Sequence, residues 1–138
     1  MKKITGNYSN AGKRPANALK MLYVNPYTRT VSTEYVENDL EAYYKLLNCS
    51  CITITSMNIR GKYFDIICDD EALLKDEPRL SMVDLRGRPA LFGCLLVCLH
   101  DREGNTVGIT DDDVKRIKSD LVTLIGVDGT TPALRGDY

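Results

Sequence analysis

The 138-residue sequence contains one histidine and no Cys-x-x-Cys pair. Structural zinc sites are built from such pairs and from histidines, so the sequence argues against a metal site. It also lacks a glycine-rich phosphate loop of the Walker or Rossmann type, and with it the main signal of those nucleotide-binding enzymes. No stretch approaches the roughly 20 apolar residues of a membrane-spanning helix. We therefore expect no metal, no cofactor and no membrane partner.

The overall composition is that of an ordinary globular chain, with 43% apolar and 27% charged residues. The formal net charge of −1 gives no general reason to expect binding to nucleic acid. The five cysteines are odd in number, and the start of the chain, Met-Lys-Lys-Ile-Thr-Gly-Asn, has no hydrophobic region of a secretion signal. An incomplete disulfide set without such a signal predicts a protein of the reducing cytoplasm.

A continuous apolar run covers Leu91–Leu99 and shows no alternation of apolar and polar residues. Arg88-Pro89 precedes the run, and the turn-forming stretch Asp101–Asn105 follows it. A short apolar run with turn residues at both ends predicts a single central strand that is buried on both faces.

Shorter strand patterns surround this run. Asn25-Pro26 separates Met21–Val24 from the alternating stretch Thr30–Val36, which predicts a hairpin. A second hairpin is predicted from Cys51–Met57 and Tyr63–Cys68.

Two helices are predicted from capping residues and helical spacing. Asn38 is the expected N-cap of the first helix, with Glu41 completing a capping box, and Asn48 is its expected end. Thr110 is the expected N-cap of the second helix, and the aspartates of its first turn suit the helix dipole. Gly126 is expected to end this second helix.

These elements predict an α+β fold, a single domain with a mostly antiparallel sheet and two helices packed against it. The domain is expected over residues 19–126, between a flexible N-terminal arm (1–18) and a loosely held C-terminal tail (127–138). The segment 69–90 has no strong periodicity, and irregular crossings of that length are often functional.

No set of residues suggests catalysis. His100 ends the apolar run beside Asp101, a position more typical of a structural or surface histidine, and a general base also needs a partner and a pocket. Asp69, Asp70 and Glu71 could bind a divalent cation, but adjacent carboxylates more often form a solvated turn. We therefore predict no catalytic residue and a binding protein rather than an enzyme.

The best candidates for ligand binding are basic residues that favour an anion. Guanidinium groups suit bidentate contact with phosphate or carboxylate, and tyrosine rings offer surfaces on which a base could stack. The predicted ligand-binding residues are Arg60, Lys62, Arg79, Arg86, Arg88 and Tyr63. Scattered surface charge is the alternative interpretation of the cations, and tyrosine is also common in strands and interfaces.

Segments between Met21 and about Leu124 match a known family in order and spacing. They are Leu22–Pro26, Leu40–Leu47, Ile52–Ile54, Phe64–Glu71, Leu91–Val97 and Gly108–Val114. In these segments the chain resembles the DUF3846 family, small proteins of unknown function from phages, plasmids and bacteria. Pro78-Arg79-Leu80 stands where the family usually has Pro-x-Asn-Arg, so a family-wide ligand site is not carried over to that position.

The resemblance implies a small cytoplasmic accessory factor, in a bacterial host if phage-encoded, that acts against host defence. The leading hypothesis is a non-enzymatic, homo-oligomeric binding protein that sequesters a small anionic ligand such as a signalling nucleotide. One alternative is a protein-interaction module that inhibits a host protein through a tyrosine-rich face. Another is a metal-dependent enzyme that degrades a signalling nucleotide with Asp69, Asp70 or His100. Nucleic-acid binding is disfavoured because only the N-terminal arm is basic.

Overall fold

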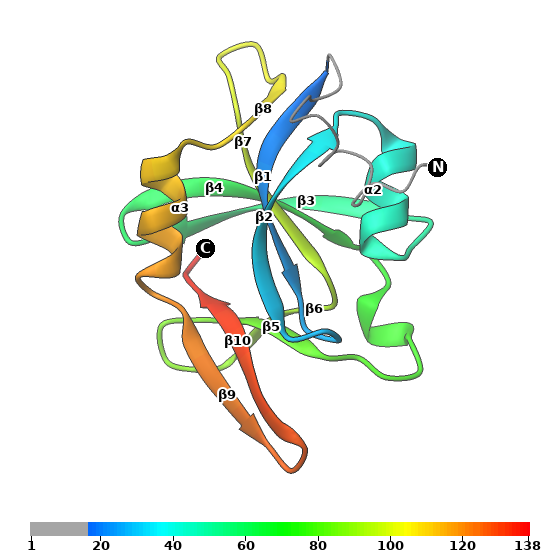
Figure 1. The fold of residues 1–138 in the computed structure, drawn as a ribbon, viewed down its shortest axis with the longest axis vertical. Coiled ribbons are helices and arrows are strands. Elements are labelled where there is room, and N and C mark those ends of the chain that lie inside the picture. Colours follow the sequence, from blue (N-terminus) through cyan, green and yellow to red (C-terminus); the bar gives the residue numbers. More distant parts are fainter. Residues whose placement is uncertain (1–16) are drawn as a thin grey trace, which may run out of the picture.

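The computed structural model of the protein describes residues 17–138, which form ten strands, two α-helices and one 3-10 turn (Figure 1). Along the chain these are β1 (Ala18–Asn25), β2 (Thr30–Glu37), α2 (Leu40–Leu47), β3 (Ile52–Ile59), β4 (Lys62–Asp69), η2 (Ala72–Leu74), β5 (Leu80–Val83), β6 (Pro89–Phe92), β7 (Leu95–His100), β8 (Thr106–Val107), α3 (Asp111–Lys118), β9 (Val122–Gly126) and β10 (Gly129–Arg135). Most of the predicted N-terminal arm lies outside the described residues, and Ala18 already belongs to β1.

The strands form two sheets, and the predicted α+β single domain is confirmed. The main sheet has the order β2-β1-β7-β4-β3, with β8 added to β7, and all of its neighbours are antiparallel. The second sheet has the order β6-β5-β10-β9, and its β5 and β10 are parallel. None of the helices from residue 17 onward is long and apolar enough to cross a membrane.

Strand β7 lies at the centre of the main sheet and is buried on both faces, as its sequence predicts. Leu95 and Val97 belong to the apolar cluster on one face, together with residues of α3 and the second sheet. Leu96 and Cys98 belong to the cluster on the other face, which α2 covers. The two helices therefore lie on opposite sides of the molecule, with the second sheet below the main one (Figure 1).

The apolar run Leu91–Leu99 is two strands, not the single strand that its composition predicts. Pro89–Phe92 is β6 of the second sheet, whereas β7 begins at Leu95 in the main sheet. Gly93 separates them with a φ of 83°, a left-handed conformation that glycine adopts without steric cost. The chain changes direction there, so one hydrophobic run serves two sheets.

The first helix matches its predicted span but not its predicted cap. Asp39 is the N-cap, because its carboxylate accepts the N–H of Ala42 at 2.8 Å. Asn38 instead accepts a hydrogen bond from the hydroxyl of Tyr43. Asn48 ends the helix in the left-handed conformation, with a φ of 52°.

The second helix is shorter than predicted. Thr110 caps it as expected, in a capping box with Asp113, but the helix ends at Lys118 rather than near Gly126. The following stretch Val122–Gly126 is strand β9, in agreement with the high strand preference of β-branched residues. The prediction failed because apolar residues continue at helical spacing past the true end of the helix.

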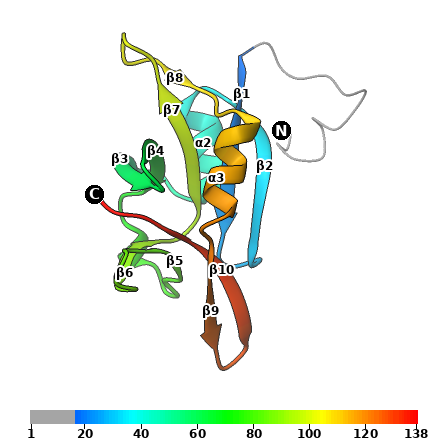
Figure 2. The ribbon, with the colours of Figure 1, turned by 90° about the vertical axis from the view of Figure 1, so that its left-hand side faces the viewer.

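The C-terminal segment is part of the fold, so the expectation of a loosely held tail at 127–138 is wrong. Strand β10 pairs antiparallel with β9 and parallel with β5. Its Ala133 and Leu134 are fully buried, and Leu134 belongs to the core cluster between the two sheets. The β9–β10 hairpin extends below the rest of the molecule in Figures 1 and 2.

Replacement of Leu134 by alanine tests whether this segment is structural. Loss of a fully buried leucine leaves a cavity, and we expect the free energy of unfolding to fall by about 2–5 kcal/mol in urea titrations. Val127→Ala, at a fully exposed position in the same hairpin, is the control and should change stability by less than about 0.5 kcal/mol. Equal stability of the two variants would support a loosely held tail instead.

Candidate functional site

The six predicted ligand-binding residues lie in three separate places. Arg60, Lys62 and Tyr63 are at the β3–β4 turn, and Arg86 and Arg88 are in the β5–β6 turn. Both turns lie on the side of the molecule that carries α3 (Figures 1 and 2). The sixth residue, Arg79, precedes β5 and contacts the β1–β2 and β9–β10 turns instead, through Tyr27 and Asp128.

The cations of the β3–β4 turn hold this turn against α3. The guanidinium of Arg60 donates to the hydroxyl of Ser119 at 3.0 Å. The backbone carbonyl of Arg60 accepts a hydrogen bond from the guanidinium of Arg116. The ammonium of Lys62 lies 2.7 Å from a carboxylate oxygen of Asp113 and 5.5 Å from the ring centroid of Phe64. Tyr63 is exposed. These contacts give Arg60 and Lys62 a structural role.

Asp113 is a buried carboxylate on which the capping box and Lys62 converge. It accepts the N–H of Thr110 at 2.9 Å, and its own N–H donates to the hydroxyl of Thr110 at 3.1 Å. Burial acts to raise the pKa of Asp113, but the Lys62 ammonium and the Thr110 hydrogen bonds outweigh it and hold the pKa below its ordinary value. The ionised form is therefore part of the fold.

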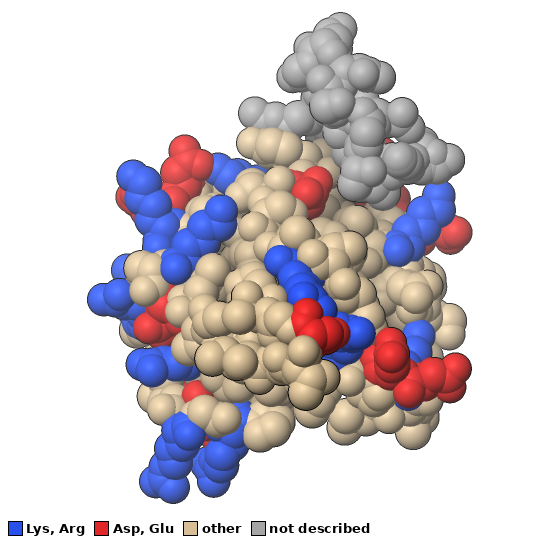
Figure 3. Space-filling view, turned by 60° about the horizontal axis from the view of Figure 1, so that its bottom comes forward, with Lys and Arg blue, Asp and Glu red and all other residues tan. Residues whose placement is uncertain are grey.

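The arginines of the β5–β6 turn surround Asp84. The carboxylate of Asp84 accepts the backbone N–H groups of Arg86 and Arg88 at 2.9 and 2.8 Å, and the Nε of Arg88 at 2.8 Å. These bonds, the backbone N–H of Arg88 first, lower the pKa of Asp84. In Figure 3 basic and acidic side chains alternate over the left-hand side of the molecule, and they form no continuous basic patch.

A cleft of about 400 Å³ opens elsewhere, at the C-terminal end of α2. Its walls come from the end of β1, the last turn of α2 and the segment 69–77, with Gly93 and Cys94 between them. These segments are far apart in the sequence and meet because β7 brings the break at Gly93 beside β1. The cleft is the best candidate for a ligand site among the described residues, since ligand sites are usually concave and of this size.

The floor of the cleft is made of neutral polar groups that bind one another. The hydroxyl of Tyr23 donates to the carbonyl of Leu46 at 2.7 Å and accepts the side-chain amide of Asn25 at 3.2 Å. It also lies 3.7 Å from the sulfur of Cys94. Burial raises the pKa of both the Tyr23 phenol and the Cys94 thiol, so both are neutral near pH 7. A thiol in this state is a poor nucleophile.

The rim of the cleft carries two lysines and an aromatic ring. Lys75 donates to the carbonyl of Asn48 at 2.8 Å, and its ammonium lies 3.3 Å from the carboxylate of Asp69. Lys45 projects from the last turn of α2, is exposed, and makes no ion pair with any residue from 17 to 138. Tyr27 donates its hydroxyl to the carbonyl of Glu77 at 3.0 Å. The arrangement offers ammonium groups and a ring to a ligand, without an activated nucleophile or base.

A comparison with protein families assigns most of the chain to a family. The family model described as a domain of unknown function (DUF3846) matches residues 19–121. The chain belongs to the DUF3846 family. No curated protein and no solved structure matches the chain. The matched residues include the whole cleft but end before β9 and β10, so the C-terminal hairpin lies outside the DUF3846 match.

The cleft residues of the DUF3846 domain were largely missed at the level of sequence. Tyr23 and Tyr27 are two of the eight tyrosines that the sequence offers as general stacking surfaces, and nothing in the sequence indicates a binding role for Asn25, Lys45 or Lys75. Tyr23, Asn25 and Tyr27 are close in sequence, but Lys45 comes from α2 and Lys75 follows η2, so spacing along the chain does not group the lysines with the tyrosines.

The residues considered for catalysis are also dispersed over the DUF3846 domain. Asp69 lines the cleft and is buried, but its carboxylate already accepts the N–H of Glu71 at 2.9 Å and pairs with Lys75. His100 is at the far end of β7, where its Nδ1 lies 2.6 Å from the carboxylate of Asp65. Over the residues that the structure describes, no group of three or more histidines, cysteines and acids could hold a metal ion.

The lowered pKa of Asp113 predicts a defined pH dependence of stability. A carboxyl with a depressed folded-state pKa stabilises the fold above the unfolded value of about 3.9, and this contribution is lost as the pH falls through the folded value. We expect Asp113→Asn to lower the free energy of unfolding by about 1–3 kcal/mol at pH 6. Urea titrations at a series of pH values should show that the difference in the free energy of unfolding between this variant and the unchanged protein shrinks below pH 4.

Asp112→Asn is the matched control, because Asp112 lies in the same helical turn but is exposed. Its effect should stay below about 0.5 kcal/mol throughout. If the loss of unfolding free energy caused by Asp113→Asn is constant from pH 6 to pH 2, the lowered pKa of Asp113 is contradicted.

Proposed function

We propose that this DUF3846 protein is a non-enzymatic, cytoplasmic binding protein that captures a small anionic ligand, such as a signalling nucleotide, in the cleft beside α2. The observation that carries the proposal is the composition of the cleft. About 400 Å³ of space is lined by two lysines, two acids that already have cationic partners, two tyrosines and neutral hydrogen-bonding groups. Such a site can hold a charged ligand, and none of its groups is activated for bond cleavage.

The charges of the cleft favour an anion over a cation. Two lysines and two acids line it, but the carboxylate of Asp69 is already paired with Lys75 and with a backbone N–H. Lys45 makes no ion pair with the described residues 17–138, and the side chain of Lys75 at the rim is 40% exposed. Phosphate groups near these ammoniums would gain charge-assisted hydrogen bonds.

The aromatic lining favours a ligand with a planar ring. Tyr27 is 42% exposed, and one of its ring faces is in contact with the guanidinium of Arg79 at 5.7 Å from the centroid. Stacking of a nucleobase on tyrosine contributes about 1–3 kcal/mol to binding, whichever base it is. A nucleotide combines this ring with a phosphate, which is why we name this ligand class.

A role against host defence, by sequestering a nucleotide-derived signal, remains part of the proposal. It is supported by the type of small protein that this family comprises and by a cleft that suits binding rather than turnover. Sequestration needs tight binding without chemistry, and the neutral Tyr23 and Cys94 at the floor meet that requirement.

Thermal unfolding in the presence of candidate ligands tests the proposal. A ligand at a hundredfold excess over its Kd stabilises the fold by about 2.7 kcal/mol, which should raise the Tm by about 5 °C or more. The candidates are 3′,5′-cyclic nucleotides, cyclic dinucleotides and ADP-ribose. We expect Lys45→Glu to abolish the rise, and Lys118→Glu, an exposed lysine on α3, to leave it unchanged.

The absence of any shift across the panel, or a shift that Lys45→Glu leaves intact, would contradict capture in this cleft. Hydrolysis of the ligand during incubation with divalent metal ions would instead identify an enzyme.

A protein-interaction module is the second candidate, and exposed leucines favour it. Leu73 and Leu74 of η2 are 65% and 80% exposed and line a groove of about 230 Å³ that also includes Thr53 of β3. Strand β3 is an edge of the main sheet and has no charged side chain. Asp137 pairs with its Asn58, but no strand of the described residues pairs with the edge before Asn58, which is open to a second copy or a host protein. Co-purification with a host protein, without stabilisation by any small ligand, would favour this second function.

A further inference from the structure

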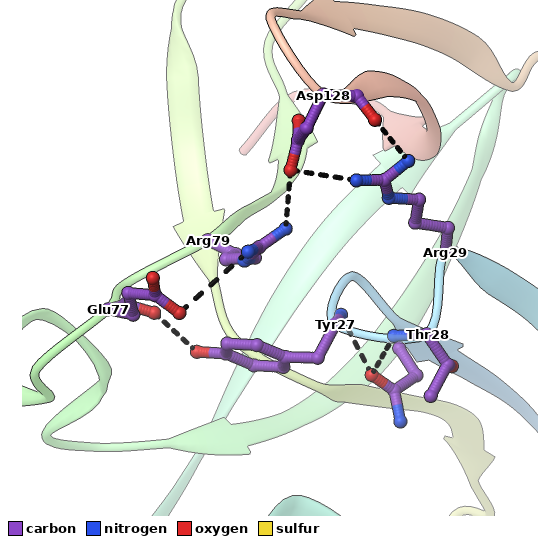
Figure 4. A network of polar contacts seen from close by, with 7 residues as sticks. Tyr27, Thr28, Arg29, Glu77, Arg79 and Asp128 are labelled. Carbon is purple, nitrogen blue, oxygen red and sulfur yellow. Dashed lines mark hydrogen bonds and ion pairs between the residues drawn. The ribbon is translucent and has the colours of Figure 1, made fainter.

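Two arginines from different parts of the DUF3846 domain converge on one carboxylate of the C-terminal hairpin (Figure 4). Arg29 is in the β1–β2 turn, Arg79 precedes β5, and Asp128 is in the β9–β10 turn. The Nη2 of Arg29 lies 2.8 Å from the Oδ2 of Asp128, and the Nη1 of Arg79 lies 3.8 Å from the same oxygen. The Nη1 of Arg29 also donates to the Asp128 carbonyl at 2.8 Å.

Arg79 is held in place without Asp128. Its guanidinium carbon lies 5.7 Å from the ring centroid of Tyr27, and its Nη2 lies 3.7 Å from the carboxylate of Glu77. Tyr27 is fixed in turn by its hydrogen bond to the Glu77 carbonyl. Arg79 therefore presents a positioned guanidinium whether or not the hairpin is there.

The hairpin is shaped to bring its turn onto Arg29. Gly129 has a φ of 126°, and a β-carbon on it would lie 2.5 Å from the Nη1 of Arg29. Arg29 itself has a left-handed backbone, with a φ of 62°, which is uncommon for a residue with a side chain. Both conformations serve the close approach of Asp128 to the guanidinium.

The residues of this contact differ in whether they fall within the family match and in how exposed their side chains are. Both arginines and Tyr27 fall within residues 19–121, which match the family, whereas Asp128 lies beyond them. The side chain of Asp128 is 59% exposed, and each arginine side chain is 32% exposed. A cavity of about 340 Å³ adjoins the contact, lined by Arg79, Asp128 and apolar residues of β9 that include Leu124 and Ile125.

We propose that Arg29 and Arg79 form an anion-binding site for a phosphate group, which Asp128 occupies as an internal ligand. Two converging guanidiniums suit the oxygens of a phosphate, and the Oδ2 of Asp128, which both guanidiniums approach, takes the place of one of them. Asp128 brings one negative charge to the two arginines, and Glu77, 3.7 Å from Arg79, brings a second, so displacing Asp128 frees the guanidinium of Arg29 for the phosphate. Because an exposed ion pair contributes little free energy, displacing Asp128 costs little.

This site is distinct from the proposed cleft, which shares no lining residue with the cavity beside Asp128 and does not include Arg29, Arg79 or Asp128. Binding at the site requires the tip of the hairpin to move, so the C-terminal hairpin controls access to it.

Titration of inorganic pyrophosphate into the full chain by calorimetry at low ionic strength tests the site. Asp128→Asn removes the competing charge and keeps the shape, and we expect it to bind pyrophosphate at least tenfold more tightly than the unchanged protein. Adding Arg79→Gln to Asp128→Asn should remove that gain. Asp101→Asn is the matched control, because Asp101 is a turn aspartate at the opposite end of the molecule, after β7.

Equal affinities of the Asp128→Asn variant and the unchanged protein would overturn the proposal, as would a gain that survives Arg79→Gln or also appears with Asp101→Asn. Circular dichroism verifies that each variant folds. If a variant does not fold, amide shifts of Asp128 and Gly129 in the unchanged protein on addition of pyrophosphate decide the matter, and no shift there overturns the site. Lys45→Glu should not alter pyrophosphate binding, which separates this site from the cleft.

Discussion

The left-handed backbone at Gly93 is the constraint on which the arrangement of the molecule depends. It divides one apolar run between two sheets, so that β6 belongs to the second sheet and β7 becomes the centre of the first. The backbone N–H of Gly93 donates to the carbonyl of Arg79 at 2.8 Å, which fixes the break between the strands next to the start of β5. A β-carbon at this position would lie 3.5 Å from that of Ala72, so the limit is conformational, at about 1–2 kcal/mol for other residues, rather than a lack of space.

Both proposed sites follow from this division. The change of direction at Gly93 brings Cys94 beside Tyr23 and leaves the cleft open between β1, α2 and the segment 69–77. It also turns the second sheet across one face of the first, where β10 adds Leu134 to the core. The hairpin that contains β10 then extends past the β1–β2 turn, and its Asp128 meets Arg29 and Arg79. The proposed cleft and the proposed anion site at the hairpin therefore depend on the same packing.

Local signals in the sequence were reliable where a single element decides the outcome. The buried centre of β7, the Thr110 cap and the end of α2 at Asn48 were all predictable from neighbouring residues. The C-terminal hairpin was not, because the spacing of apolar residues carries the pattern of α3 past Lys118, and only pairing with β5 makes β10 a strand. The site was missed for the same reason. Arginines grouped by sequence lie in three places, whereas Tyr23, Lys45 and Lys75 meet only in the folded chain.

Capture of an anionic ligand in the cleft is tested most directly by mapping where a ligand binds. We would titrate ADP-ribose into the ¹⁵N-labelled full chain and follow the backbone amides by NMR. Saturable shifts at Asn25, Lys45 and Asn48, with one ligand per chain, are the expected result, because these residues line the cleft. No saturable shift with ADP-ribose, or with any cyclic nucleotide used in its place, would contradict the proposed function, as would shifts confined to residues outside the cleft.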